Sequence, residues 1–249
     1  MTGRTFIKLA ALSAFAAGAA VVVAAPSPSA GATRPAGERP AFSAMQHSLE
    51  TQLARRQVQL ARRQVQLVHL SADLTAATSL TAANAALLRG RLAAETAAIN
   101  ALAAKAPNDR SIAQLKAERR AMIRQSRVYA VMTPQVFQVI EAASASVQLA
   151  GLQAQQSALA TAVGALIGQP GAATASRHYR DFVARLQVAA RATAEVDTTV
   201  LAQVPEDFPR DTHVFVAAGR RLLAAEVSLA RADYDATVIN LASGGYQGA

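Results

Sequence analysis

The stretch 54-ARRQVQLARRQVQL-67 contains one seven-residue phrase twice, and this repeat decides the fold that the sequence predicts. Leucine at every seventh position is typical of an α-helix that packs against another helix along one seam. The same register continues before and after the repeat. Its positions are Leu53, Leu60, Leu67, Leu74, Thr81, Leu88, Glu95 and Leu102. The repeat therefore belongs to one long coiled-coil helix, which we predict over residues 40–105.

The repeat also carries four arginines, and these raise the question of whether it is a basic patch with a chemical role. With the leucines on the seam, we expect Arg55, Arg56, Arg62 and Arg63 to point away from it. Charged residues on the outer face of a helical coil usually maintain solubility. We therefore expect a solvated face at the repeat and not a site of chemistry.

The composition favours closely packed helices and excludes chemistry that depends on cysteine. Hydrophobic residues make up 52% of the 249 residues, but only 4% are aromatic and Trp is absent. The core of such a chain consists mainly of Ala, Leu and Val. Because Cys is also absent, the chain has no disulfide, no thiolate nucleophile, no Cys-based zinc site and no lipid anchor through Cys.

The N-terminal segment has the pattern of a secretory signal peptide. Arg4 and Lys8 precede an uncharged run over residues 9–25, and small residues of the kind that a signal peptidase recognises end at Ala32. We predict a signal peptide over 1–32, cleaved at its end, and therefore export to the periplasm, the cell wall or the medium. The alternative is an uncleaved membrane anchor, because the uncharged run reaches the lower limit for spanning a bilayer.

The remainder of the chain is predicted to form one helical domain. Pro35 and Gly37 indicate a short flexible leader over residues 33–40. Residues 41–243 are rich in strong helix formers, and Pro and Gly gather at only a few places within them. A disordered tail is expected over 244–249. Besides the first helix, the breakers delimit helices over 110–132, 134–167, 174–203 and 210–242.

Two helix starts have specific capping patterns. Ser111 followed by Gln114 is typical of a capping box, in which the hydroxyl accepts from the third backbone N–H of the helix. Thr133 before Pro134 predicts an N-cap followed by proline at the first helical position. Whether Pro134 ends one helix or only kinks it is left open by the sequence.

The strongest structural prediction is an antiparallel hairpin that turns at Pro107. In such a hairpin, residues at equal distances before and after the turn face each other. Leu102 then faces Ile112, and the two charged residues that interrupt the seam, Glu95 and Arg119, also become level. We expect them to form an interhelical ion pair, which would penalise wrong registers more than it would add stability.

The predicted fold class is all-α: an antiparallel bundle of about four helices, from which residues 81–132 project as a two-helix antiparallel coiled-coil hairpin. If the chain folds back at Pro134, the alternative is a compact bundle of five or six helices. Three apolar stripes are expected to build the bundle core. They are Leu149, Leu152, Leu159, Val163 and Leu166 on the third helix; Phe182, Leu186, Ala189, Val196 and Val200 on the fourth; and Phe215, Ala218, Leu222, Ala225, Leu229, Ala232, Ala236 and Ile239 on the fifth.

The charge is concentrated on the predicted arm. Residues 81–132 carry nine basic and three acidic residues, and the whole chain has a net charge of +9. This favours an anionic partner, such as acidic lipid or an anionic wall polymer, or another protein. Nucleic acid is not expected, because no aromatic residues are interleaved for base stacking. Self-association through helical faces is left open. The candidate contacts are Arg89, Arg91, Lys105, Arg110, Lys116, Arg120, Arg124 and Arg127.

The long stretch 142–176 contains no charged residue, although glutamines interrupt it. This pattern predicts a central bundle helix covered by its neighbours, and the glutamines argue against a transmembrane helix. The alternative function rests on the same stretch: a membrane-active or lipid-binding bundle would expose this helix to a membrane interface.

Enzymatic motifs were not found, and no catalytic residue, cofactor or metal is predicted. The histidines are scattered, and neither metal-binding helix motifs nor a glycine-rich phosphate loop is present. His69 with Asp73 and His178 with Asp181 are expected to form local hydrogen bonds. The sequence therefore predicts an exported, non-enzymatic helical scaffold or interaction protein of the cell envelope, with the basic arm as its contact surface.

Overall fold

The computed structural model describes residues 39–106, 111–125, 128–204 and 212–244. Within these ranges it describes the side chains of all residues except 39–44, 124, 125 and 212. The predicted signal peptide, most of the leader and the tail beyond Gly244 lie outside these residues. The chain divides into two compact units, Met1–Ala41 and Phe42–Ala249. The first unit contributes only the first residues of one helix to the described part, so the fold below is that of the second unit.

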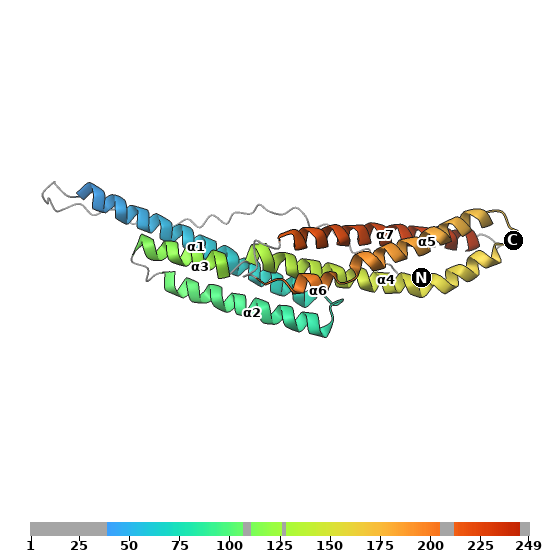
Figure 1. The fold of residues 1–249 in the computed structure, drawn as a ribbon, viewed down its shortest axis with the longest axis horizontal. Coiled ribbons are helices and arrows are strands. Elements are labelled where there is room, and N and C mark those ends of the chain that lie inside the picture. Colours follow the sequence, from blue (N-terminus) through green and yellow to red (C-terminus); the bar gives the residue numbers. More distant parts are fainter. Residues whose placement is uncertain (1–38, 107–110, 126–127, 205–211, 245–249) are drawn as a thin grey trace. The chain divides into compact units, whose positions relative to one another are not determined.

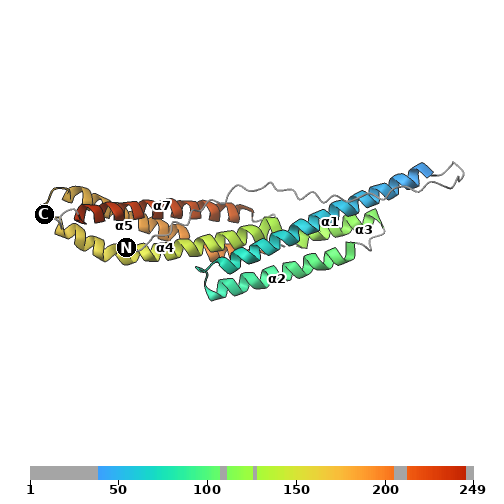
Figure 2. The same cartoon turned by 180° about the vertical axis from the view of Figure 1, so that it is seen from behind.

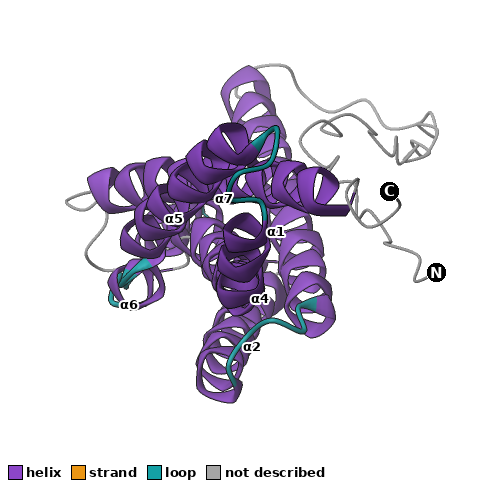
Figure 3. Cartoon of the chain, turned by 90° about the vertical axis from the view of Figure 1, so that its right-hand side faces the viewer, coloured by secondary structure: helices purple, strands orange, loops and turns teal. Residues whose placement is uncertain are grey.

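The described residues form helices and no strand, which confirms the all-α class (Figure 3). Figure 1 labels the helices along the chain, and Figure 2 shows them from behind. They are α1 (Arg39–Ala76), α2 (Ala82–Lys105), α3 (Ile112–Gln125), the π-helix η2 (Val128–Met132), α4 (Thr133–Ala165), α5 (Ala172–Thr193), α6 (Val196–Leu201) and α7 (Thr212–Gly244).

The single helix predicted over 40–105 is wrong, because the chain leaves the helical conformation between α1 and α2. Thr81 has an extended backbone (φ −64°, ψ 150°), and its hydroxyl accepts from the backbone N–H of Asn84 at 3.2 Å. This is an N-cap, for which threonine is well suited. Hydroxyl side chains cluster before it at Thr75, Thr78 and Ser79, and such residues compete with the helical backbone for hydrogen bonds. Thr81, where the series of leucines is interrupted, therefore lies at the point where the chain reverses its direction.

After this reversal, α2 runs back along α1. The Gln64 amide donates to the side-chain oxygen of Asn100 at 2.8 Å, and the Arg56 guanidinium donates to the carbonyl of Leu102 at 3.4 Å. A lower residue number on α1 thus meets a higher one on α2, as in any antiparallel pair.

Helix α3 completes a three-helix unit with α1 and α2. The Arg56 guanidinium pairs with the Glu118 carboxylate, and the Arg63 guanidinium lies over the Tyr129 ring, so α1 and the α3–η2 segment run in the same direction. One apolar cluster includes leucines of α1, residues of α2 and Met122 of α3. The predicted arm of two helices alone is therefore not what the structure shows, because α1 shares the same core.

The ion pair between Glu95 and Arg119 stays a prediction. Glu95 is buried in α2, whereas Arg119 is exposed. The neighbouring acid Glu118 pairs with Arg56, which comes from α1. A two-helix alignment cannot anticipate a charge contributed by a third helix.

The chain stays helical through Pro134. Met132 has helical backbone angles (φ −63°, ψ −42°), and the π-helix η2 leads directly into α4. The Thr133 hydroxyl donates to the carbonyl of Val128 at 2.9 Å, so the predicted N-cap at Thr133 is wrong. Proline has no N–H to donate, and a π-turn adapts the helix to that loss. The other predicted cap is confirmed, since the Ser111 hydroxyl accepts from the Gln114 N–H at 3.2 Å.

The bundle that follows contains α4, α5 and α7, with the short α6 beside α4. The predicted stripes on these helices are buried or partly buried, and Leu152, Phe182 and Leu229 share one apolar cluster. The uncharged part of α4 packs one face against its neighbours through Leu149, Leu152 and Leu159, but most of its other described residues are exposed, so the prediction of a central helix covered by its neighbours is wrong. The leucines of α1 share another cluster with Val136 of α4 and Leu222 of α7, so α1 packs against the end of the bundle that these residues form.

The helix predicted over 174–203 is interrupted between α5 and α6. Glu195 has a left-handed backbone (φ 61°), which separates the two helices. The Arg221 guanidinium of α7 donates to carbonyls at the end of α5, at 3.2 Å to Ala192 and 3.1 Å to Arg191, and also to Ala194. These are carbonyls that the ending helix leaves without partners. A cation at this end also complements the helix dipole.

Replacing Glu195 with glycine should stabilise the protein. A non-glycine residue in the left-handed conformation costs about 1–2 kcal/mol, and the extra freedom of unfolded glycine offsets about 0.5–1 kcal/mol of that. We expect Glu195→Gly to raise the free energy of unfolding by about 0.5–1 kcal/mol in urea denaturation. Ala194→Gly is the control, since Ala194 has an ordinary φ of −52°, and it should be destabilising.

Candidate interaction surface

The two arginines in each copy of the repeat have different environments. Arg55 and Arg62 are exposed, whereas Arg56 is only 6% exposed and Arg63 is half-buried. The prediction that all four point into solvent is therefore wrong for the second arginine of each copy. Each inward arginine lies one helical turn before a seam leucine, on the same side of α1. In a two-helix coil that position is at the edge, but here α3 covers it.

The inward arginines are used to join α1 to its neighbours. Arg56 binds the Leu102 carbonyl of α2 and the Glu118 carboxylate of α3. The Arg63 guanidinium lies 5.6 Å from the centre of the Tyr129 ring, a cation–π distance. Burial lowers the pKa of Arg63 from its usual value, and Tyr129 acts in the opposite direction. These side chains are not available to an outside partner.

Arg91, a predicted partner contact, is also used within the fold. Its guanidinium donates to the Leu201 carbonyl at 2.8 Å and to the Gln203 carbonyl at 3.3 Å, at the end of α6. About two helical turns earlier on α2, the Asn84 side-chain amide donates to the Asp197 carboxylate of α6 at 3.0 Å. Arg91 thus holds α6 against α2 and satisfies carbonyls at a helix end.

The other predicted contacts remain on the surface wherever the structure describes them. Arg110, Arg127 and the side chain of Arg124 lie outside the described residues. The structure adds Arg55 and Arg62 to the exposed bases, and sequence reasoning had assigned these two only a solvating role. The exposed basic side chains of α1–α3 are Arg55, Arg62, Arg89, Lys105, Lys116, Arg119 and Arg120.

The acids of the three-helix unit do little to balance these bases at the surface. Glu95 is buried and Glu118 pairs with Arg56. Among the described side chains of α1–α3, the exposed acids are Glu50 and Asp73. The exposed surface of the unit is therefore still strongly basic, with seven bases against two acids among its described side chains.

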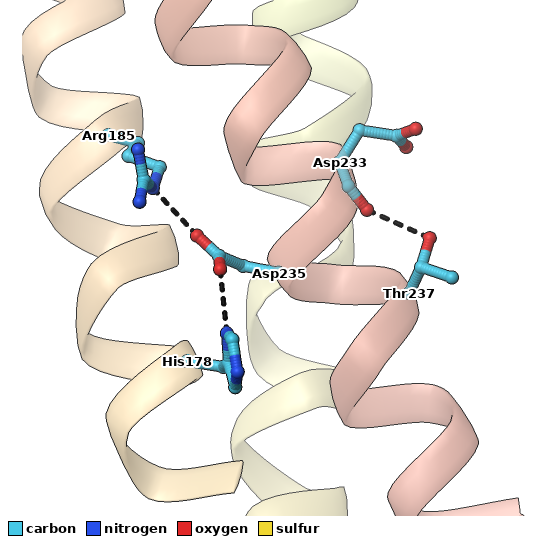
Figure 4. Close-up of polar contacts among 5 residues, drawn as sticks. All are labelled: His178, Arg185, Asp233, Asp235 and Thr237. Atoms are coloured by element: carbon cyan, nitrogen blue, oxygen red, sulfur yellow. Dashed lines mark hydrogen bonds and ion pairs between the residues drawn. The ribbon is translucent and has the colours of Figure 1, made fainter. Parts of the chain in front are cut away.

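A second polar cluster joins α5 to α7 around Asp235, whose side chain is 3% exposed (Figure 4). Its two carboxylate oxygens have different partners: His178 Nδ1 lies 2.8 Å from Oδ1, and Arg185 Nε donates to Oδ2 at 2.7 Å. The expected bond between His178 and Asp181 is thus replaced by one between helices. His178 and Arg185 are seven residues apart on α5, and this spacing was the signal that could have placed both against α7.

The Asp235 cluster has the properties of a structural contact. Both carboxylate oxygens are engaged by side chains of α5, and the Asp235 side chain is almost fully buried. No group of three or more potential ligands that could hold a metal ion occurs within the described ranges. The other predicted local pair, His69 and Asp73, is exposed, and no hydrogen bond joins these two described residues.

Comparison with protein-family models, with curated proteins and with solved structures found no match to this chain. Within the part of the chain that the structure describes, no helix is both long enough and apolar enough to span a membrane.

The repeat supplies a matched pair of substitutions for testing the role of Arg56. Arg56→Met should lower the free energy of unfolding by about 1–3 kcal/mol, because Glu118 loses the partner of its partly buried carboxylate. Arg55→Met removes the adjacent exposed arginine and should change it by less than about 0.5 kcal/mol. Chemical denaturation measures both, and equal effects would contradict the inward role of Arg56.

Asp235 and Asp233 form a second matched pair on α7. Asp235→Asn should lower the free energy of unfolding by about 1–3 kcal/mol, since His178 and Arg185 lose a buried carboxylate. Asp233 is exposed, and only its backbone carbonyl is engaged, by the Thr237 hydroxyl at 2.9 Å. Asp233→Asn should therefore leave the thermal midpoint nearly unchanged. A similar loss in both variants would contradict the structural role of the cluster.

Proposed function

We propose that this protein is an exported, non-enzymatic interaction protein of the cell envelope, and that the three-helix unit of α1–α3 binds an anionic partner. The observation that carries the proposal is the imbalance of exposed charge on these helices. Seven basic side chains are exposed, against two acidic ones among the described residues of the unit. A surface of one sign attracts partners of the opposite sign over a distance of about 10 Å at moderate salt.

The arrangement of the exposed bases suits an extended anionic surface. Arg55 and Arg62 are one heptad apart, so they lie on the same side of α1 at a spacing of about 10 Å. Their neighbours Arg56 and Arg63 anchor the same stretch of helix to α2, α3 and η2. The outward arginines are therefore presented by a backbone that is already held in place. Acidic lipid and anionic wall polymers both offer repeated negative charges to such a row.

The non-enzymatic part of the proposal is supported by the roles of the polar side chains. Arg91 and Arg221 satisfy carbonyls at helix ends, and Asp235 joins two helices. Each of these three side chains makes its polar contacts within the described fold. Export rests on the pattern of residues 1–32, which lie outside the described structure.

The competing function is insertion of the uncharged helix into a membrane. Insertion would require α4 to leave α5 and α7 and to expose Leu149, Leu152 and Leu159, which are buried between them. The exposed bases need no such rearrangement, and for this reason we favour surface binding.

Co-sedimentation with vesicles tests the proposal. Each basic residue at an anionic membrane surface contributes about 1 kcal/mol, so Arg55→Gln with Arg62→Gln should weaken binding to anionic vesicles on the order of tenfold or more. Binding of the unaltered protein should fall as salt is raised and should be absent with neutral vesicles. The same assay with a soluble anionic polysaccharide as competitor separates lipid from polymer.

The control removes two exposed arginines elsewhere: Arg177→Gln with Arg180→Gln on α5. This variant should keep most of the affinity. Equal losses in the two double variants would show that only net charge matters and would contradict the assignment to α1–α3. Salt-resistant binding with leakage of vesicle contents would instead favour insertion of α4.

A further inference from the structure

The outward face of α7 is apolar over most of its length. On the neighbouring helix α5, the outward face is charged, with Arg177, Arg180 and Asp181 exposed. On α7 five exposed positions hold large hydrophobic side chains, beside the exposed charged residues Arg220, Glu226, Arg231 and Asp233. The hydrophobic side chains are Val216 (53% exposed), Leu223 (60%), Val227 (41%), Tyr234 (63%) and Leu241 (72%). Scattered exposed hydrophobic residues are ordinary, but a continuous row along one helix marks an interaction surface.

These residues follow the spacing of a coiled-coil seam. The intervals between successive positions alternate between four and three residues, over more than three heptads. The complete seam is Val216, Arg220, Leu223, Val227, Ala230, Tyr234, Thr237 and Leu241, and all its members are exposed. The buried row of α7, which includes Leu222, Leu229 and Ile239, lies on the opposite side of the helix. Helix α7 therefore has two seams, and the bundle fills only the inner one.

The charges beside the outer seam indicate which partner fits. Glu226 and Asp233 lie along one edge of the seam, and Arg231 lies along the other. In a parallel coiled coil of two identical helices, a side chain at the edge that holds Glu226 meets a side chain of the other helix at the edge that holds Arg231. The residue it meets lies five positions later in the sequence. Glu226 would then meet Arg231 of the other copy, twice by symmetry. In an antiparallel pair with Leu223 opposite Tyr234, Glu226 would instead approach Asp233, a repulsive contact.

We propose that a second copy of the chain docks on this outer seam, with the two α7 helices parallel and in register. The contact is isologous, as most homodimer contacts are. Arg220 occupies one core position of the seam, where a polar side chain lowers stability but specifies register and a two-stranded state. The contact uses α7 alone and does not depend on the anionic partner proposed for α1–α3.

The environment of Glu226 supports this arrangement. Partial burial and then the charge of Glu226 raise the pKa of Glu141 on α4. Glu226 therefore lies close enough to Glu141 for the two carboxylates to repel each other. Arg231 from a second copy would offset that charge, whereas an acidic neighbour would add to it.

Sedimentation equilibrium of the full-length chain tests the dimer. The unaltered protein should associate reversibly to a dimer, and Leu223→Glu should raise the dissociation constant by at least about tenfold, because a carboxylate enters the centre of the seam. Val188→Glu on α5 is the control, since Val188 is 42% exposed, and it should not change association. A monomer at all concentrations overturns the proposal, and so does a dimer that persists in Leu223→Glu.

Charge reversal tests the parallel pairing. Glu226→Arg alone and Arg231→Glu alone should each weaken the dimer, and the two changes together should restore it. The first change also removes the repulsion with Glu141, so the monomer should become no less stable while the dimer weakens. Failure of the double variant to restore association overturns the pairing of Glu226 with Arg231.

Cross-linking tests orientation directly, because the chain contains no Cys. A cysteine placed by Leu223→Cys should form a covalent dimer under mild oxidation, since in-register core positions of a parallel pair bring the two β-carbons close enough for a disulfide. Arg177→Cys on α5 should stay monomeric on a non-reducing gel. An antiparallel pair would instead link only when Leu223→Cys and Tyr234→Cys proteins are mixed, and that result overturns the parallel arrangement.

Discussion

The buried guanidinium of Arg56 joins the first three helices that the structure describes. A charged group removed from water must be paired and hydrogen bonded, or its burial becomes strongly unfavourable. Arg56 meets this requirement where a carboxylate of α3 and a carbonyl of α2 converge on α1. The leucines supply most of the apolar contact, but leucine seams tolerate a slip of one heptad. A slip that brought Leu49 to the place of Arg56 would leave Glu118 without its cation, whereas the opposite slip would replace Arg56 by Arg63. Arg56 therefore restricts the register in one direction.

Long polar side chains serve the same purpose at the ends of other helices. Arg91 and Gln135 both donate to carbonyls at the end of α6, and Arg221 donates to those at the end of α5. The ends of α5 and α6 are therefore each held by donors from a neighbouring helix. Because several charges are used in this way, the charge that remains at the surface differs from the charge that composition alone suggests.

Local and periodic features of the fold could be predicted from the sequence, and contacts between distant helices could not. The cap at Ser111 and the buried stripes of α4, α5 and α7 depend on near neighbours or on helical periodicity. The reversal at Thr81 was missed because the leucine register continues across it into α2. The partners of Arg56 and His178 were missed because each comes from another helix. In the surface site, the exposure of Lys116 and Arg120 could be predicted from the pattern of apolar and charged residues along the helix. The internal role of Arg91 could not, because the carbonyls that it binds belong to α6.

The duplication in α1 also affects how this protein can change in length. Seven residues make nearly two full turns of helix, so adding or deleting one copy rotates the remaining residues by only about 20°. It would displace the beginning of the helix by about 10 Å and keep one arginine inward and one outward in every copy. Tandem duplication errors in the gene can therefore extend or shorten this helix in whole heptads. Such changes alter its reach and leave its pattern of contacts intact.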